Sequence, residues 1–220
     1  MPVTNKNISS VLRLLKKALK GFPDPSVTLV GKRWGDPFLV LISCLLSLRT
    51  QDRTTLPAAE RLFALADNPA AMLKISIARI QKAIYPVGFY KTKARRIHEI
   101  CRGLLERYGG KVPADIDELL TLNGVGRKTA NLVLTEGFHK PGICVDTHVQ
   151  RISNRFGYVQ TTTALETEKT LRKKLPKRFW IEYNATLVLW GQNVCRPISP
   201  LCSCCVVNKF CAKVGVAMHR

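Results

Sequence analysis

Acidic residues and long apolar runs are both scarce in this sequence. Its 220 residues include 15 Asp and Glu against 35 Lys and Arg, which gives a formal net charge of +20. So strong an excess of positive charge excludes an acidic, solvating protein and predicts a polyanionic partner. The longest apolar run, at residues 38–46, is interrupted by Ser43 and is far shorter than the roughly 18 residues of a membrane span. We therefore expect no membrane partner.

Cysteine is equally scarce over most of the chain. Only Cys44, Cys101 and Cys144 precede residue 195, and the other five lie within residues 195–211. A secreted disulfide scaffold spreads its cysteines among loops, so this crowding predicts a metal site in a reducing compartment. Residues 1–22 contain no uninterrupted apolar segment of the kind that a secretory signal needs. We expect an intracellular protein, cytoplasmic and nucleoid-associated if its source is prokaryotic.

Alternating strand patterns are absent, and apolar residues recur at helical spacing over most of the chain. The length suits one large domain or two small ones. We predict an all-α fold of about ten helices, with residues 26–35 irregular and residues 85–90 forming a turn. The predicted helices cover residues 8–22, 36–48, 53–65, 69–73, 75–84, 91–108, 115–122, 127–138, 146–156, 164–175 and 180–192.

Residues 119–134, with the sequence LLTLNGVGRKTANLVL, form the most informative segment. Gly124 and Gly126 permit a positive φ and a close backbone approach, and Val125 between them is expected to pack inward. The amides of this turn and of the helix that follows lack intrahelical partners, so they could hold a phosphate. The segment resembles the helix–hairpin–helix motif, which holds a DNA backbone without reading its sequence. The plain structural alternative is a helical hairpin that ends at a glycine.

Lys128 occupies the first turn of the second predicted helix, where the helix dipole disfavours a cation. The dipole, neighbouring Arg127 and any burial would all favour the neutral amine. A neutral lysine beside a bound phosphate is a nucleophile suited to Schiff-base chemistry at a sugar carbon. The residues leave a second interpretation equally open, in which Lys128 is one more phosphate contact.

Asp146 opens the predicted helix at residues 146–156, so its first expected role is that of a helix cap. It follows Lys128 by 18 residues, about one helix and a return loop, which would allow the two side chains to face one pocket. A carboxylate there could stabilise positive charge on a deoxyribose ring or move a proton. Capping and catalysis are compatible, so both interpretations stand.

The C-terminal cysteines follow the pattern Cys195-x6-Cys202-x2-Cys205-x5-Cys211, with Cys204 as an extra thiol. Two zinc-binding knuckles would show two short pairs, and only one is present. Four thiolates at this spacing fit a [4Fe–4S] cluster better. Free thiols and disulfides are the alternatives, and Cys204 could replace Cys205 only if the loop shifted its register.

Taken together, these features resemble the endonuclease III family, DNA glycosylases of the helix–hairpin–helix superfamily. The resemblance covers nearly the whole chain and rests on LNGVGRKTANLVL, VDTHVQRISNRFG and the cysteine spacing. It implies that Lys128 is the catalytic nucleophile and Asp146 the catalytic carboxylate. It also implies that the [4Fe–4S] cluster is held by Cys195, Cys202, Cys205 and Cys211.

The same resemblance implies two helical domains that flank a DNA-binding cleft. One is a continuous six-helix domain over residues 30–138, which contains the hairpin. The other is a helical iron–sulfur domain formed by residues 1–29 and 139–220, with the cluster in a C-terminal loop.

Two further segments resemble the family's DNA-inserting loops. LLSLRTQDRTT is similar to the segment that enters DNA near the damaged base, and VGFYKTKA to a second, opposing loop. Arg49 stands where the family usually has a wedge glutamine, with Gln51 two positions on, and Phe89 stands where an aliphatic intercalator is common. A guanidinium and an aromatic ring could still fill these roles, although Phe89 could instead be a core residue in a turn. The other implied DNA contacts are Gly124, Gly126, Arg127 and His148.

The activity implied is a bifunctional DNA N-glycosylase and AP lyase that removes oxidised pyrimidines through a lysine Schiff base and β-elimination. Its expected partner is double-stranded DNA that contains damaged pyrimidines or abasic sites, and the expected oligomeric state is a monomer. Two alternatives stay open: a monofunctional mismatch glycosylase, and a noncatalytic iron–sulfur DNA-binding protein. The lysine distinguishes them, because mismatch-specific relatives usually carry a small hydroxyl residue or a tyrosine at this position.

Overall fold

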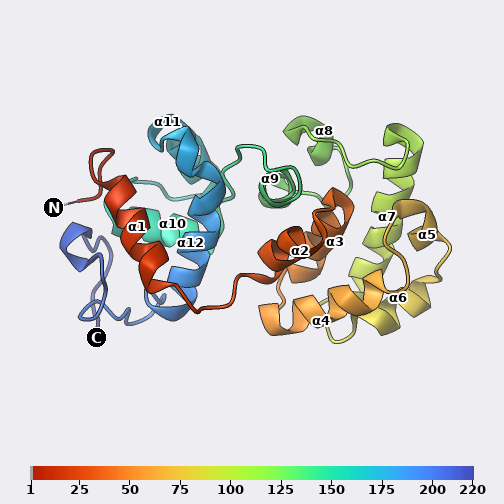
Figure 1. The fold of residues 1–220 in the computed structure, drawn as a ribbon, viewed down its shortest axis with the longest axis horizontal. Coiled ribbons are helices and arrows are strands. Elements are labelled where there is room, and N and C mark those ends of the chain that lie inside the picture. The colour runs from red at the N-terminus through yellow and green to blue at the C-terminus, as the bar shows by residue number, and fades with distance from the viewer. Residues whose placement is uncertain (1) are drawn as a thin grey trace. The chain divides into compact units, whose positions relative to one another are not determined.

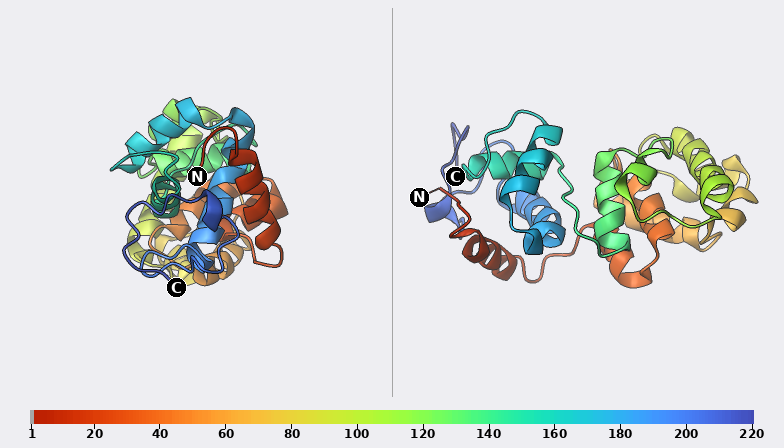
Figure 2. Two further views of the ribbon diagram at one scale, coloured as in Figure 1. Left: turned by 90° about the vertical axis from the view of Figure 1, so that its left-hand side faces the viewer. Right: turned by 90° about the horizontal axis from the view of Figure 1, so that it is seen from above.

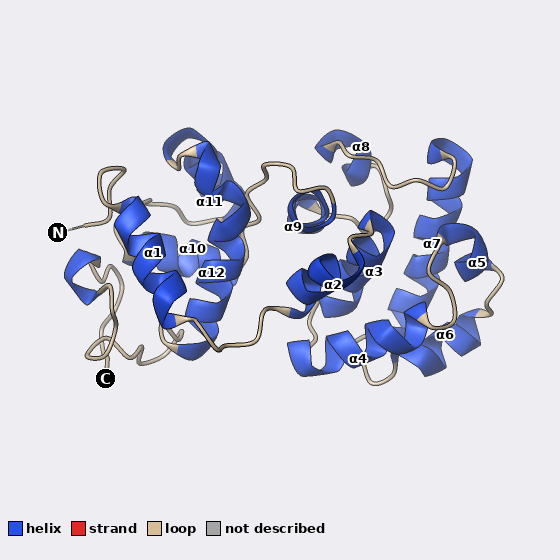
Figure 3. Ribbon diagram, in the orientation of Figure 1, coloured by secondary structure: helices blue, strands red, loops and turns tan. Residues whose placement is uncertain are grey.

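The computed structural model describes residues 2–220, and the regular elements among these residues are all helical (Figures 1 and 3). This confirms the predicted all-α class. Twelve α-helices lie in the described part of the chain, joined by short loops and single turns of other helix types. In residues 2–220 no helix combines the length and the apolar character that crossing a membrane would require.

The chain divides into two compact units. Unit 1 consists of Met1–Asp24 and Ile143–Arg220, and unit 2 is the continuous segment Pro25–Gly142. The sequence prediction placed these boundaries at residues 30 and 138. The early boundary differs because residues 26–34 belong to a helix of unit 2 rather than to a connection.

Unit 2 is built around one apolar helix. Its elements are α2 (Ser26–Trp34), α3 (Pro37–Ser47), α4 (Asp52–Phe63), α5 (Pro69–Leu73), α6 (Ile77–Ile84), α7 (Tyr90–Tyr108), α8 (Ile116–Leu120), α9 (Arg127–Leu132) and a π-helical turn at Val133–Gly137. Every residue of α3 from Phe38 to Leu46 is buried, because α2, α4, α7, α9 and the π-helical turn surround it. The expected number of six helices is therefore wrong, since unit 2 holds eight.

The missed helix is α2, where the prediction of an irregular stretch is wrong. Its sequence contains β-branched residues and Gly31, which are weak helix formers. Val27 and Val30 are nevertheless buried against the rest of unit 2. Gly31 lies so close to the π-helical turn that a Cβ atom would stand 2.7 Å from the carbonyl oxygen of Glu136. Tertiary packing, rather than local propensity, therefore forms α2.

The segment predicted as one helix over residues 127–138 changes its winding after Leu132. The α-helix α9 gives way to the π-helical turn, which ends at Gly137. A Cβ atom at Gly137 would lie 3.0 Å from the Cα atom of Pro37, so this turn packs closely on the start of α3.

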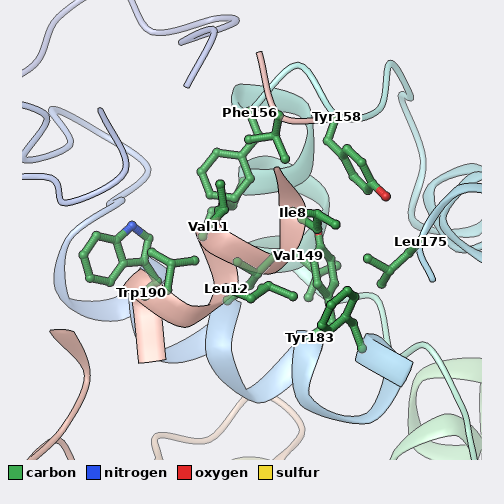
Figure 4. Packing of buried hydrophobic residues seen from close by; sticks show 14 of the residues in the cluster. Ile8, Val11, Leu12, Val149, Phe156, Tyr158, Leu175, Tyr183 and Trp190 are labelled. Carbon is green, nitrogen blue, oxygen red and sulfur yellow. The ribbon is translucent and has the colours of Figure 1, made fainter. Parts of the chain in front are cut away.

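Unit 1 brings together both ends of the described chain (Figure 2). It contains α1 (Ile8–Ala18), α10 (Thr147–Arg155), α11 (Ala164–Lys174) and α12 (Trp180–Asn193). Figure 4 shows how α1 inserts its apolar side chains between α10 and α12. The labelled core residues are Ile8, Val11, Leu12, Val149, Phe156, Tyr158, Leu175, Tyr183 and Trp190.

Candidate functional site

The predicted hairpin is formed by α8, a glycine-containing turn and α9 (Figure 1). The turn is closed by a hydrogen bond from the Val125 amide to the Leu122 carbonyl, at 3.0 Å, and Val125 is buried as expected. Gly124 has a φ of +86°, and a Cβ atom there would lie 2.6 Å from the side chain of Arg96. Gly126 begins α9 in an extended conformation, and a Cβ atom there would have no neighbour within 4 Å. The turn therefore presents open backbone at Gly126 and close packing at Gly124.

Lys128 lies in the first turn of α9 and is exposed. Thr129, Ala130 and Asn131, which follow it, are buried and anchor the helix in unit 2. The amide side chain of Asn131 donates a 3.0 Å hydrogen bond to the Arg127 carbonyl. α9 thus holds the backbone of Lys128 firmly while its amine reaches the surface.

One neighbour of Lys128 is a buried thiol. Burial strongly raises the pKa of Cys44 on α3, and the positive charge of Lys128 acts in the opposite direction. Cys44 therefore stays a neutral thiol beneath α9 and behaves as a small apolar core residue.

Asp146 is the N-cap of α10, which confirms its predicted capping role. Its Oδ1 atom accepts hydrogen bonds from the amides of His148, at 2.9 Å, and Val149, at 2.8 Å. The cap uses one carboxylate oxygen, so Oδ2 lies outside it. His148 is half-buried, and its Nδ1 atom lies 3.0 Å from a guanidinium nitrogen of Arg151. Asp146 belongs to unit 1, whereas Lys128 belongs to unit 2.

Arg49 and Phe89, predicted to insert into DNA from two separate loops, are neighbours in unit 2. The Arg49 guanidinium carbon lies 5.6 Å from the centroid of the Phe89 ring. Both residues have a positive φ, of 51° and 58°. Phe89 is 62% exposed, so the alternative that it is a core residue is wrong. Gln51 is also exposed and begins α4.

Sequence reasoning missed a residue that binds the loop carrying Arg49. Lys93 is buried on α7, and its ammonium group donates hydrogen bonds to the segment around Arg49. A signal was present, because Lys93 falls on the same helical stripe as Ile97, Ile100 and Leu104, which are all buried. A charged residue on an apolar stripe needs partners inside the protein.

The four predicted ligand cysteines line one cavity in unit 1. Cys195, Cys202, Cys205 and Cys211 surround a small cavity of about 20 Å³, whereas Cys204 is exposed and lies outside it. None of the eight cysteines forms a disulfide, so the disulfide alternative is wrong. Among the described residues, no three His, Cys, Asp or Glu side chains converge as closely as a single metal ion requires. Four cysteine thiols that line one cavity match the donor set of an iron–sulfur cluster.

Burial and the nearby charge of Arg155 affect the protonation of the cysteine thiols at this cavity. Burial raises the pKa of Cys205 to about 11, and burial also raises the pKa values of Cys202 and Cys211. Arg155 is buried beside them, with its guanidinium 3.4 Å from the sulfur of Cys195. Cys202, Cys205 and Cys211 would therefore release protons on binding a cationic iron group.

Comparison with known proteins identifies the family. A profile described as "HhH-GPD superfamily base excision DNA repair protein" matches residues 42–177. Endonuclease III of Thermotoga maritima is 48% identical over 176 residues, which cover 80% of this chain and 83% of that protein. Endonuclease III of Escherichia coli is 35% identical and covers 93% of this chain and 96% of its own length.

Solved structures agree with this result. A structure described as a trapped endonuclease III–DNA covalent intermediate is 33% identical, has a TM-score of 0.82 and covers 96% of this chain and 97% of its own. A thermostable thymine-DNA glycosylase, at 24% identity and a TM-score of 0.80, shares the fold. The chain therefore belongs to the endonuclease III family within the HhH-GPD superfamily of base excision DNA repair proteins.

Proposed function

We propose that this chain removes oxidised pyrimidines from duplex DNA and then cuts the strand, with Lys128 as the nucleophile and Asp146 as the assisting carboxylate. Family membership makes the chain a base-excision repair DNA glycosylase with AP lyase activity. The choice of damaged base and the roles of individual residues are the proposal. One observation carries it: Lys128 stands exposed in the first turn of α9, directly after the Gly124–Gly126 turn.

The proposed chemistry begins with attack on the sugar. The Lys128 nitrogen forms a bond to C1′ of the damaged nucleotide, and the bond from C1′ to the base breaks, so that the base leaves with the bonding electrons and takes one proton from that nitrogen. The Asp146 carboxylate stabilises the positive charge that develops on the ring. The remaining proton on this nitrogen passes to O4′ as the bond between C1′ and O4′ breaks, which opens the ring and gives an imine between Lys128 and C1′.

The imine then drives strand cleavage. It acidifies the C2′ proton, and removal of that proton pushes electrons toward C3′, where the bond to the 3′ phosphate oxygen breaks. This β-elimination leaves an unsaturated sugar on Lys128, and water hydrolyses the imine to release it. The relative solved as a trapped covalent intermediate with DNA supports a covalent pathway for this chain.

DNA binding is proposed for the residues around these two. Gly124, Gly126 and Arg127 would hold phosphate at the hairpin, and His148 would contact DNA near Asp146. Arg49 and Phe89 would fill the gap left by the flipped nucleotide, with Gln51 beside them. In place of a glutamine amide, the Arg49 guanidinium would donate hydrogen bonds to the orphaned opposite base. The net charge of +20 would attract any DNA duplex nonspecifically.

We further propose that Cys195, Cys202, Cys205 and Cys211 hold a [4Fe–4S] cluster. The position of all four thiols at one shared cavity supports this assignment. When bound, the cluster would cross-link the C-terminal loop through its four thiolate ligands. The proposal also includes a monomeric enzyme that acts inside the cell, in a nucleoid if the source is prokaryotic.

A duplex that carries one thymine glycol tests the proposed function. The wild-type holoprotein is expected to release the base and cut the strand 3′ to the lesion, and Lys128→Gln is expected to do neither. Base release without strand cleavage would favour the monofunctional alternative. Binding without base release would favour a noncatalytic DNA-binding protein. Matched duplexes with uracil or 8-oxoguanine in place of thymine glycol measure the preference for oxidised pyrimidines.

A further inference from the structure

Two loops of unit 2 are held together by a hydrogen bond and by a close contact at Gly88. We call residues 48–51 the wedge loop and residues 85–89 the opposing loop. The Gly88 amide donates a 3.1 Å hydrogen bond to the Thr50 hydroxyl. A Cβ atom at Gly88 would lie 2.6 Å from the Arg49 carbonyl oxygen, so only glycine allows this contact without a shift. The two loops therefore touch through main chain at the positions next to Arg49 and Phe89.

Lys93 on α7 adds further hydrogen bonds to the wedge loop. We call the contacts among Lys93, Thr50 and Gly88 the junction. The Lys93 ammonium group donates three hydrogen bonds: to the Leu46 carbonyl at 2.7 Å, the Leu48 carbonyl at 2.6 Å and the Thr50 hydroxyl at 3.2 Å. Leu46 and Leu48 lie at the C-terminal end of α3, where a helix leaves carbonyl groups without amide partners and favours a cation. The three donors of one ammonium group thus satisfy acceptors on both sides of Arg49.

The same lysine is connected to Phe89. Its own amide donates a 3.0 Å hydrogen bond to the Phe89 carbonyl. Burial lowers the pKa of Lys93 to about 8, which still leaves the ammonium group protonated at neutral pH. The side chain is only 5% exposed, so the junction is shielded from water.

The backbone at Arg49 and Phe89 needs this support. Residues other than glycine rarely adopt a positive φ, and they keep it where surrounding contacts impose it. In this conformation the two exposed side chains lie against each other, guanidinium over ring. Without the junction, each loop would be free to relax and the pair would separate.

We propose that Lys93 is a positioning residue that locks the wedge and opposing loops together, so that Arg49 and Phe89 enter DNA as one preformed pair. This inference rests on the proposed function, because it assigns the pair to the gap left by a flipped nucleotide. Lys93 acts through Arg49 and Phe89 and touches no reacting atom. Its effect is therefore confined to duplex DNA, where a base pair must be opened.

The test measures single-turnover strand cleavage by the holoprotein on two DNAs: a duplex with thymine glycol, and a single strand with a preformed abasic site. Lys93→Met is expected to slow cleavage of the duplex about tenfold and to leave the single strand unchanged. In the Arg49→Ala background, Lys93→Met should slow the duplex reaction much less, because the two residues act as a unit. Lys82→Met is the matched control, since Lys82 is an exposed lysine of the same unit on α6.

Three results would overturn the inference. The first is that Lys93→Met slows cleavage of both DNAs equally, and the second is that Lys93→Met has the same cleavage rates as Lys82→Met. The third is that the effects of Lys93→Met and Arg49→Ala on the duplex cleavage rate are independent. If Lys93→Met does not fold, Thr50→Val decides, because it removes the hydroxyl that both Lys93 and Gly88 contact. Thr50→Val should slow cleavage of the duplex by about threefold and leave cleavage of the single strand unchanged. An unchanged rate of duplex cleavage would overturn the inference. A wild type that cleaves neither DNA would overturn the proposed function itself.

Discussion

In the proposed mechanism, Asp146 serves two roles with a single side chain. A helix cap needs an oxygen that accepts hydrogen bonds from the first amides, and Oδ1 of Asp146 does this for His148 and Val149. Stabilising a cationic sugar needs a negative charge, which an amide side chain lacks. The two roles can therefore be separated by substitution.

Asp146→Asn keeps the capping oxygen and removes the charge. We expect thermal stability to change little and the rate of base release to fall by about 10²–10³-fold. Asp146→Ala removes the cap as well, so it should lose a further ~1 kcal/mol of stability. Melting curves and single-turnover rates for the two variants check this. An Asp146→Asn variant with full activity would show that Asp146 is only a cap.

Lys93 gives a dependence of stability on pH. Its folded pKa is about 8, below its ordinary value of 10.5. Between these values the unfolded chain still holds a proton that the folded chain has lost, so stability rises with pH. Below pH 8 the cost of burying the charge is present in full. The partners of the ammonium group, two carbonyls and a hydroxyl, do not titrate in this range.

We expect the wild type to gain at most about 3 kcal/mol relative to Lys93→Met as the pH rises from 8 to 10.5. Melting temperatures of the two proteins across this range measure the gain. Other titrating groups cancel in the difference between the two proteins. Parallel pH profiles would contradict the assignment.

At the residue scale, the sequence predicted positions that follow local rules. Asp146 as a cap and Val125 as an inward-facing residue need only their neighbours in the chain, and both predictions are confirmed. The contact between Arg49 and Phe89 and the role of Lys93 depend on segments about 40 residues apart in the chain. No local pattern predicts which partners a buried ammonium group will find.

At the scale of elements, the two glycines of the hairpin turn are present for different reasons. Gly124 is needed for its positive φ and for the space that Arg96 fills. Gly126 has an ordinary φ of −94° and open space around its Cβ position, so the folded protein alone does not require glycine there. A close approach of DNA phosphate would supply the missing reason.

This difference predicts contrasting effects of two alanine substitutions. Gly126→Ala should leave stability unchanged and weaken binding to an abasic-analogue duplex by about fivefold. Gly124→Ala should destabilise unit 2 by about 1–2 kcal/mol, because it combines an unfavourable φ with a clash. Fluorescence anisotropy and thermal melts distinguish the two effects. Unchanged DNA affinity in Gly126→Ala would remove that residue from the binding surface.

Helices with strong local signals were predicted well. The basic amphipathic helix α7 and the capped helix α10 lie within one residue of their expected ranges. α2 was missed because its residues favour other conformations and are overruled by packing against the π-helical turn. The change of winding after Leu132 has no signature in the residues themselves.

At the scale of the whole molecule, the chain forms two cores. Unit 1 is completed by its N-terminal helix and its C-terminal segment, whereas unit 2 is continuous. Cys195, Cys205 and Cys211 pack against the core of unit 1. The sequence predicted a division into two parts from resemblance and not from composition, since helical texture runs through both.

Removal of one proposed cluster ligand should therefore change the stability of unit 1 more than that of unit 2. Cys205→Ser is expected to abolish the visible absorption of an iron–sulfur cluster and to lower the melting temperature by about 5–10 °C. Hydrogen exchange should accelerate in α10 and α12 and stay unchanged in α3 and α7. Cys204→Ser is the matched control and should keep the cluster. Loss of the cluster in Cys204→Ser, with retention in Cys205→Ser, would reassign the ligand.

The most direct measurement of the central claim is borohydride trapping followed by peptide mapping. Borohydride reduces an imine to a stable amine, so a covalent pathway leaves the protein attached to thymine-glycol DNA. We predict a crosslink at Lys128, its complete loss in Lys128→Gln, and its slower formation in Asp146→Asn. A crosslink at another residue, or base release with no crosslink at all, would contradict the account.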